Sequence, residues 1–448
     1  MKKRTLVLVA GASSVAIGLA TVGIGGNANN RPSSSVDRQT LSFDRQTIER
    51  GRYLAVAGDC IACHTGSGEK PFAGGLRMDT PIGKIYSTNI TPDKLTGIGN
   101  YTFTDFDRAL RQGIRRDGDP LYPAMPFVSY ARLKPADVRA LYAYFMHGLE
   151  PVAQNNKAPE ISWPLSMRWP LRVWAMTFAP QPEVDETPVP ESGIARGRYL
   201  VEGLGHCGAC HTPRGLGFQE KVLSNIDSRY LAGGVVDGYL AKNLRGDRQD
   251  GLGNWTHDQI VEFLKTGRNE HSAAFGSMAD VIENSTQHLS ISDLSAMAEF
   301  LKSLSPVTAL EPNTTRSDLT AARLRVGSDR SNGSLTFVDN CAACHRTDGI
   351  GYDRTFPMLS QSSVVNSQDP TSLIHIVLRG AEMPSTQTAP TSFSMPGFAG
   401  RLTNRDIADL LTFVRSSWGN RAPPVSTEQV EKVRKSLHLT TPVRPENS

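Results

Sequence analysis

All six cysteines of this 448-residue chain lie in three copies of one pattern, Cys-x-x-Cys-His. The copies are Cys60-Ile61-Ala62-Cys63-His64, Cys207-Gly208-Ala209-Cys210-His211 and Cys341-Ala342-Ala343-Cys344-His345. In this spacing two thiols add to the vinyl groups of a haem as thioethers, and the histidine offers its imidazole to the iron. Residues i, i+3 and i+4 of a helical turn share one face, so all three groups can reach one porphyrin. The pattern therefore predicts three covalently bound c-type haems.

Other uses of paired cysteines fit these motifs less well. A disulfide framework gives no reason for a histidine after every second cysteine. A structural zinc ion needs four ligands, whereas each motif offers at most three and has no second ligand pair nearby. A thioredoxin-like redox pair belongs to a βαβ pattern that the sequence lacks. Haem attachment is the interpretation that uses every residue of the repeated motif.

A six-coordinate haem also needs a ligand on its distal side, where methionine raises the reduction potential relative to histidine. One methionine follows, at a similar distance, the glycine that ends each of three predicted helices. Met125 lies 12 residues after Gly113, Met278 lies 11 residues after Gly267, and Met395 lies 15 residues after Gly380. Met125 and Met395 precede a proline, which fixes the loop, and Met278 does not. We predict these three methionines as axial ligands.

Three other side chains remain alternatives at the distal positions. Met383 also precedes a proline, but it lies only three residues after Gly380, which is short for a loop that crosses a haem face. His271 and His288 flank Met278 in the sequence and could bind the second iron in its place.

The motifs sit in a repeated helical pattern. The sequence Arg-Gly-Arg-Tyr-Leu precedes the first two motifs at residues 50–54 and 196–200, and the third keeps only Gly333 and Phe337. Amphipathic patterns predict middle helices over 103–113, 257–267 and 370–380, and closing helices over 135–149, 292–304 and 404–418. We expect N-caps at Thr102 and Thr256, and capping boxes at Ser290/Asp293 and Thr403/Asp406. A mainly α chain of three tandem units follows.

This order of elements resembles the cytochrome c fold. In that fold the first and last helices cross, with a glycine and an aromatic residue at the contact. The resemblance implies that Gly51 and Tyr53 face Tyr142 and Phe145, that Gly197 and Tyr199 face Met297 and Phe300, and that Gly333 and Phe337 face Leu410 and Phe413.

Composition divides the rest of the chain. Residues 1–28 join three basic residues to an uncharged apolar run and predict a secretory signal, with an uncleaved membrane anchor as the alternative. We expect cytochrome c domains over 45–155, 193–304 and 331–420, a proline-rich linker over 156–192, a polar linker over 305–330 and a polar tail over 421–448. The domains are then exported.

Charge and aromatic content bear on partners. The net charge is +4, and three of these positive charges belong to the leader, so a nucleic-acid partner is not expected. Residues 162–178 hold three of the five tryptophans together with two arginines. Such a segment is typical of a membrane interface or a protein contact, and packing between the chain's own domains is the alternative.

The motifs together resemble the cytochrome c subunits of membrane-bound bacterial dehydrogenases for alcohol, gluconate, and fructose or sorbitol. The similarity covers about residues 46–420 and rests on the three motifs, the Arg-Gly-Arg-Tyr-Leu leads, Tyr86–Pro92 with the following Gly-Ile-Gly-Asn, and Tyr122-Pro123-Ala124-Met125-Pro126. It implies a separate catalytic subunit with PQQ or flavin, and electron transfer through this chain to ubiquinone at the periplasmic face of the cell membrane. Residues 389–398 and 417–420 favour the alcohol dehydrogenase branch.

No catalytic residue is predicted. Three irons closed by methionine leave no open coordination site, and the sequence shows no nucleophile with a base, no Rossmann fingerprint and no phosphate loop. The alternatives are a stand-alone periplasmic multihaem carrier and a peroxidase-like haem enzyme, in which the iron near Met278 would stay open.

Overall fold

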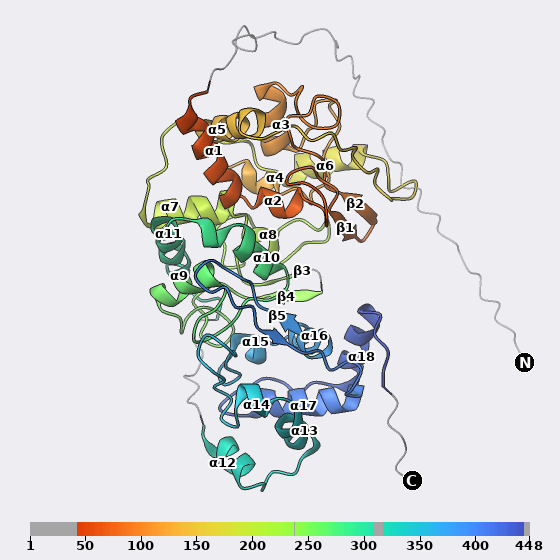
Figure 1. Ribbon diagram of the computed structural model, residues 1–448, viewed down its shortest axis with the longest axis vertical. Helices are drawn as coiled ribbons and strands as arrows, with labels where there is room; N and C mark the ends of the chain where they lie inside the picture. The colour runs from red at the N-terminus through yellow and green to blue at the C-terminus, as the bar shows by residue number, and fades with distance from the viewer. Residues whose placement is uncertain (1–42, 237, 309–316, 443–448) are drawn as a thin grey trace, which may run out of the picture. The chain divides into compact units, whose positions relative to one another are not determined.

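The computed structural model describes residues 43–236, 238–308 and 317–442 (Figure 1). The predicted leader, residues 1–28, lies outside the described residues. The described chain is mainly helical, as the sequence predicts, with three two-stranded antiparallel hairpins.

The elements follow one another in three similar groups. The first runs α1 (Arg45–Ala57), α2 (Cys60–Cys63), β1 (Arg77–Thr80), β2 (Gly83–Tyr86), α3 (Phe103–Gln112), α4 (Phe127–Tyr130) and α5 (Pro135–His147), and α6 (Trp169–Phe178) follows it. The second runs α7 (Gly193–Tyr199), η2 (Leu200–Leu204), α8 (Gly208–His211), β3 (Gly234–Val236), β4 (Tyr239–Ala241), α9 (His257–Thr266), α10 (Ser277–Asn284), η3 (Thr286–His288) and α11 (Ile291–Lys302).

The third group starts after α12 (Leu319–Arg325). It runs α13 (Asn332–Asn340), α14 (Ala342–His345), α15 (Ser363–Asn366), α16 (Thr371–Arg379), β5 (Ala381–Glu382), β6 (Ser394–Met395) and α17 (Asn404–Ser416), and α18 (Thr427–Ser436) packs against it. We call the stretches α1–α5, α7–α11 and α13–α17 the first, second and third unit. The hairpins pair Arg77 with Tyr86, Gly234 with Ala241 and Ala381 with Met395.

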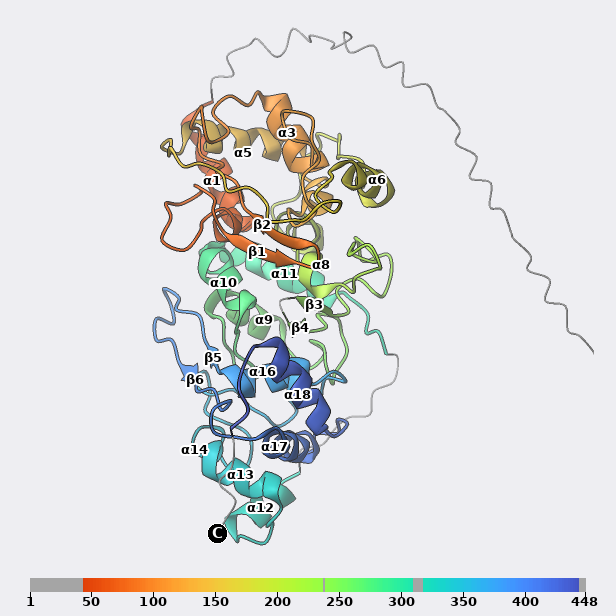
Figure 2. The same cartoon turned by 90° about the vertical axis from the view of Figure 1, so that its right-hand side faces the viewer.

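In each unit the first helix crosses the last, as the cytochrome c resemblance implies (Figure 1, Figure 2). The repeated glycine lies at each crossing because a Cβ atom there would overlap a backbone carbonyl oxygen of the last helix. The carbonyls belong to Ala140 for Gly51, Ala296 for Gly197 and Asp409 for Gly333. The nearest aromatic residue is Tyr144 at Gly51, Phe300 at Gly197 and Phe413 at Gly333. At Gly51, Tyr144 thus takes the place expected for Tyr142 and Phe145.

The helix caps are mostly those predicted. Thr102, Thr256 and Thr403 each form a complete capping box, with Asp105, Gln259 and Asp406. The box predicted at Ser290 is half formed. The Ser290 hydroxyl accepts the Asp293 N–H at 3.1 Å, but the Asp293 carboxylate is directed elsewhere.

The Asp293 carboxylate binds two residues of the Arg-Gly-Arg-Tyr-Leu repeats. Arg196, from the second unit itself, reaches it at 2.7 Å, and the Tyr53 hydroxyl of the first unit donates to it at 2.6 Å. The same contact occurs a second time with the roles of the two units exchanged. Arg50 reaches Asp137 at 2.8 Å within the first unit, and the Tyr199 hydroxyl of the second unit donates to Asp137 at 2.7 Å.

We call these two contacts the tyrosine–aspartate exchange. They correct the expectation that Tyr53 and Tyr199 fill the helix crossings of their own units. Each tyrosine instead joins its unit to the other, and the first arginine of each repeat holds the aspartate of its own unit in place.

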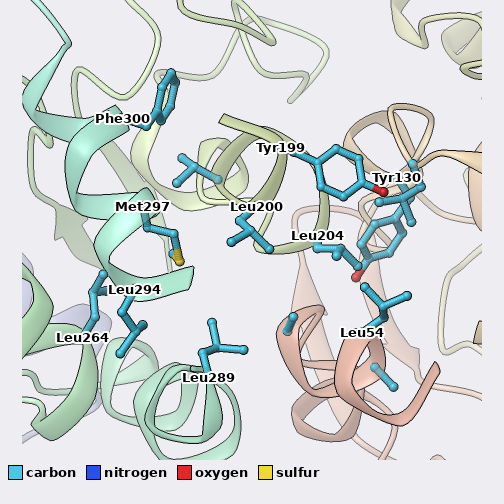
Figure 3. Packing of buried hydrophobic residues seen from close by; sticks show 14 of the residues in the cluster. Leu54, Tyr130, Tyr199, Leu200, Leu204, Leu264, Leu289, Leu294, Met297 and Phe300 are labelled. Atoms are coloured by element: carbon cyan, nitrogen blue, oxygen red, sulfur yellow. The ribbon is translucent and has the colours of Figure 1, made fainter. Parts of the chain in front are cut away.

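The first two units also share one hydrophobic core. Figure 3 shows Leu200 and Leu204 of η2 between Leu54 of the first unit and the second-unit residues Leu294 and Met297. The third unit has its own core, which Phe337, Leu410 and Val414 help to form. Burial of such side chains supplies most of the stabilisation of a domain. We therefore expect the first two units to unfold together.

The segment predicted as a proline-rich linker, residues 156–192, makes specific contacts. Lys84 and Glu160 exchange backbone hydrogen bonds at 3.1 and 2.8 Å, which adds a short bridge beside β2. Helix α6 lies further along this segment. Its Arg172 donates to the Gly118 carbonyl at 2.7 Å, and its Trp174 donates to the Gly217 carbonyl at 2.8 Å. Helix α6 thus contacts both the first and the second unit.

Candidate haem sites and family

Each Cys-x-x-Cys-His motif lies on a single helical turn directly after the first helix of its unit. The turns are α2, α8 and α14. None of the six cysteines forms a disulfide bond. The structure thus places the two sulfurs and the imidazole of each motif on one turn, the arrangement that the sequence predicts for haem attachment.

Each of the three motif histidines forms the same kind of hydrogen bond, between its Nδ1 atom and a backbone carbonyl. Nδ1 lies 2.7 Å from the Thr88 carbonyl in His64, 2.7 Å from the Lys242 carbonyl in His211 and 3.0 Å from the Pro357 carbonyl in His345. A carbonyl oxygen only accepts, so Nδ1 carries the proton and Nε2 keeps its lone pair. A metal-binding histidine has this arrangement because the second hydrogen bond fixes the ring and its tautomer.

Burial keeps these imidazoles neutral. Burial lowers the pKa of His64 and His345, and it lowers the pKa of His211 to about 4. A neutral imidazole is the form that binds iron. The histidines therefore suit a permanent axial ligand.

Four of the six cysteines do not have the properties of reactive thiols. Burial raises the pKa of Cys60, Cys207 and Cys341 to about 12 and that of Cys63 to about 11. Reactive and metal-binding cysteines have lowered pKa values, since the thiolate is the reactive form. These values argue against a nucleophilic or redox thiol and agree with a structural attachment point.

The third unit contains an apolar cavity in which the predicted haem ligands meet. Cys341, Cys344 and His345 line it, and so does Met395. Met395 is held there by the pairing of β6 with β5. The cavity fits a flat apolar cofactor, because Phe337, Leu411 and Val414 contribute to its lining.

Two further methionines line this cavity. Met383, the alternative distal ligand, is one of them. Met358 is the other, and it was not predicted from the sequence. Met358 directly follows Pro357, whose carbonyl oxygen accepts a hydrogen bond from His345 Nδ1.

The other two predicted methionines are half-buried against the core of the first two units. Met125 lies in the loop before α4, and Met278 lies in the first turn of α10. The histidines proposed as alternatives to Met278 are engaged elsewhere. The His271 ring stacks on the Trp255 ring with 5.5 Å between the ring centroids, and His288 Nε2 lies 3.0 Å from the Glu283 carbonyl oxygen.

The carbonyls that bind the motif histidines were not predicted from the sequence. A signal was present in the first two units, because an asparagine follows each carbonyl and lies eight residues before the repeated Gly-x-Gly-Asn. Asn89 accepts the Thr91 N–H at 2.9 Å, and Asn243 accepts the Arg245 N–H at 2.8 Å. These side chains fix the loops that present the carbonyls.

A buried acid beside the first motif was missed as well. Asp59 has a positive φ of 49° and lies directly before Cys60. Within the described residues its Oδ1 has no hydrogen-bond partner. Burial, with a smaller contribution from the charge of Asp280, raises the pKa of Asp59 to about 8.

Comparison with known proteins agrees with this geometry. The cytochrome c family model matches residues 48–148 and 331–418. The gluconate 2-dehydrogenase cytochrome c subunit of Pantoea cypripedii is 54% identical over 397 residues, which cover 86% of this chain and 89% of that protein. This chain belongs to the family of cytochrome c subunits of membrane-bound dehydrogenases.

Other members of the family are similarly close. The cytochrome c subunit of the quinone alcohol dehydrogenase of Gluconacetobacter polyoxogenes is 51% identical over 86% of this chain and 84% of its own length. The fructose dehydrogenase cytochrome subunit of Gluconobacter japonicus is 38% identical over 86% of this chain and 82% of its own length. The gluconate and alcohol subunits are thus almost equally similar to this cytochrome subunit.

Membership in the family gives the protein a c-type haem cofactor, and the motif residues fit it. Bound haem supplies a one-electron redox centre. Across residues 43–236, 238–308 and 317–442, no helix combines the length and the apolar character needed to cross a bilayer.

Proposed function

We propose that this cytochrome subunit carries three haem c groups. Their covalent attachment points are Cys60 and Cys63, Cys207 and Cys210, and Cys341 and Cys344. Their axial ligand pairs are His64 with Met125, His211 with Met278, and His345 with Met395. The common hydrogen bond of the three histidines supports this assignment, since each leaves Nε2 available to iron. The engagement of His271 and His288 elsewhere supports Met278.

We also propose the domain division expected from the sequence, with cytochrome c domains over 45–155, 193–304 and 331–420. The separate core of the third unit supports the boundary before it. Because the first two domains share a core and the tyrosine–aspartate exchange, we propose that they fold and move as one unit.

We propose that the protein relays electrons from a catalytic dehydrogenase subunit, carrying PQQ or flavin, to ubiquinone at the periplasmic face of the cell membrane. The relatives named for alcohol and gluconate dehydrogenases support the partner. The observation that carries the proposal is the triple repetition of a motif with a fixed imidazole. The chain's own residues hold the proximal ligands, exclude water and fix the separation of the first two motifs.

The mode of membrane contact follows from helix α6 and the residues before it. Trp163, Trp169, Val173 and Met176 are exposed, by 80%, 62%, 54% and 87%, and no residue of α6 is buried. Residues 161–182 contain no Asp or Glu, and they include Arg168 and Arg172. Exposed tryptophan beside arginine is typical of contact with anionic lipid headgroups. We propose that this surface, which we call the α6 surface, rests on the membrane.

Purification of the native complex tests the function. We expect a large catalytic subunit at equal stoichiometry, and we expect its alcohol or sugar substrate to reduce all the haem of this chain in the absorbance spectrum. A cytochrome that purifies alone and is not reduced by any such complex would reject the proposal. Ferric spectra with a high-spin component would favour an open iron and a peroxidase-like activity.

A further inference from the structure

A small cavity lies between the first two units, next to the second Cys-x-x-Cys-His motif and the loop that carries Met125. Pro123, Ala124 and Pro126, around the ligand Met125, form one wall. Trp174 and Phe178 of α6 form another, and the third contains Ala209, from the second Cys-x-x-Cys-His motif, with Leu223. Its volume is about 100 Å³, while one water needs roughly 10–15 Å³ on the same measure. This volume is less than the roughly 150 Å³ of an apolar cavity that holds benzene, so a larger ring would extend through the mouth of the cavity.

A buried carboxyl group faces this cavity. Glu220 is only 8% exposed and lines the wall, and within the described chain no hydrogen bond reaches its carboxylate. Burial raises the pKa of Glu220 to about 7, although the charges of Arg214 and Arg132 oppose this shift. Buried polar groups normally have partners, so an acid without one is a costly feature unless a ligand or water binds it.

Further unpaired polar atoms lie beside Glu220. The buried Tyr230 hydroxyl and the Arg132 Nε have no hydrogen-bond partner among the described residues. A Cβ atom at Gly208 would overlap Glu220 Oε2 and would come within 3.1 Å of the Tyr230 ring. Glycine at this motif position therefore gives Glu220 its place against the second haem motif, where the other motifs have Ile61 and Ala342.

The lining of the cavity also includes Arg214 and Gln219, and exposed apolar side chains lie nearby. Helix α6 carries the exposed side chains of the α6 surface on its outer side, while Trp174 and Phe178 line the cavity. The neighbouring loop adds Leu216 and Phe218, exposed by 104% and 61%, and its Gly217 carbonyl accepts the Trp174 N–H. A polar site behind an apolar surface matches a ligand with a polar ring and a hydrophobic tail.

We infer that this cavity binds the ring of ubiquinone, with Glu220 directed at a ring carbonyl and the isoprenoid tail leaving along the α6 surface. The inference rests on the proposed function and gives that function a location. Reduction of the quinone takes up two electrons, which come from the dehydrogenase substrate through the relay, and two protons. Glu220 gives one proton to a carbonyl oxygen and regains it from solvent, and water supplies the other, so that both carbonyls become hydroxyls.

Two substitutions test the site in the purified complex with its catalytic subunit. Glu220→Gln keeps the shape and removes the acid, and Leu223→Trp fills the cavity. Ile226→Trp is the matched control, because Ile226 lies three residues further on and is 94% exposed. Haem content and the reduced spectrum establish that each variant is loaded. Activity is measured with a short-chain ubiquinone and with ferricyanide as acceptors, and binding of the same quinone to the oxidised complex is measured by calorimetry.

For Leu223→Trp we expect the KM for quinone to rise and the affinity to fall by about tenfold or more, a change of about 1.4 kcal/mol in binding free energy. For Glu220→Gln we expect kcat with quinone to fall by about tenfold or more, since a general acid contributes about 10²–10⁴-fold. Ferricyanide reduction should stay within about twofold in both variants, and Ile226→Trp should match the wild type throughout.

Unchanged quinone binding and kinetics in both variants, with an active wild-type complex, would place the quinone elsewhere and leave the proposed function intact. Equal losses with quinone and ferricyanide would also overturn the site, because they would indicate a general defect in the relay. A wild-type complex that reduces ferricyanide but never quinone would instead reject the proposed function.

Discussion

Removal of one tyrosine hydroxyl group from the tyrosine–aspartate exchange should weaken the contact between the first two units by a measurable amount. In the wild type, the Tyr53 hydroxyl donates to the Asp293 carboxylate at 2.6 Å and accepts the Ser290 N–H at 3.2 Å. A hydrogen bond to a charged group contributes about 1.5–3 kcal/mol. Asp293 keeps Arg196 in the Tyr53→Phe variant, so no isolated buried charge remains. We therefore expect a loss near 2 kcal/mol.

Calorimetry of the haem-loaded protein measures this loss. Because the first two units share a core and the third has its own, we expect two transitions. Tyr53→Phe should lower the transition of the first two units by about 4–8 °C, since 1 kcal/mol shifts Tm by roughly 2–4 °C in a body of this size. The third-unit transition should not move. Tyr199→Phe should have the same effect, because its hydroxyl donates to Asp137 at 2.7 Å.

The pH dependence adds a second readout. Burial alone would raise the pKa of Asp293, but the hydrogen bonds from Arg196 and Tyr53 outweigh it and hold the pKa below its usual value. A carboxylate with a lowered pKa stabilises the fold above its unfolded pKa, and this stabilisation is lost as the pH falls through the folded pKa. In the Tyr53→Phe variant, the loss of stability on acidification should begin at a higher pH than in the wild type. Tyr352→Phe, on a tyrosine that is 49% exposed in the third unit, is the control. A wild-type Tm in Tyr53→Phe, or an equal shift of both transitions, would refute this reasoning.

Three further predictions concern the haem sites. Met395→Leu should lower the potential of the third haem or open its iron while covalent attachment persists, whereas Met383→Leu should leave the redox titration unchanged; the opposite pattern would make Met383 the ligand. Gly208→Ala should destabilise the first two units by about 1–3 kcal/mol, because the new methyl group strikes Glu220, and an unchanged Tm would show that Glu220 moves freely. Asp59→Asn should reduce the loss of stability between about pH 4 and pH 8, since an acid whose folded pKa is raised to about 8 destabilises the fold as the pH rises through that range; identical pH profiles would contradict it.

Local patterns in the sequence predicted the elements well. Two middle helices and one closing helix begin where the caps at Thr102, Thr256 and Thr403 place them, because a cap is a contact between residues three apart. The glycine of Arg-Gly-Arg-Tyr-Leu lies at the helix crossing, as expected, since only glycine allows that approach of two backbones.

Long-range contacts could not be derived in the same way. Tyr53 and Tyr199 have the spacing of core residues, and nothing in one repeat shows that each phenol binds an aspartate of the other. Helix α6 lies in a proline-rich stretch that is typical of a linker. Its contact with the second unit depends on Trp174 reaching a loop 43 residues away in the sequence. The carbonyls of Thr88, Lys242 and Pro357 have no side-chain signature of their own, although Asn89 and Asn243 mark two of them.

The count of attached haems is the most direct test of the central claim. This claim is that the six cysteines of the chain hold three haems, whose irons pass electrons onward. Mass spectrometry of the protein isolated from its native complex should show the polypeptide plus three haem masses, and the substrate of the dehydrogenase should reduce all three. A protein with fewer than three haems, or with a haem that the substrate never reduces, would contradict the claim.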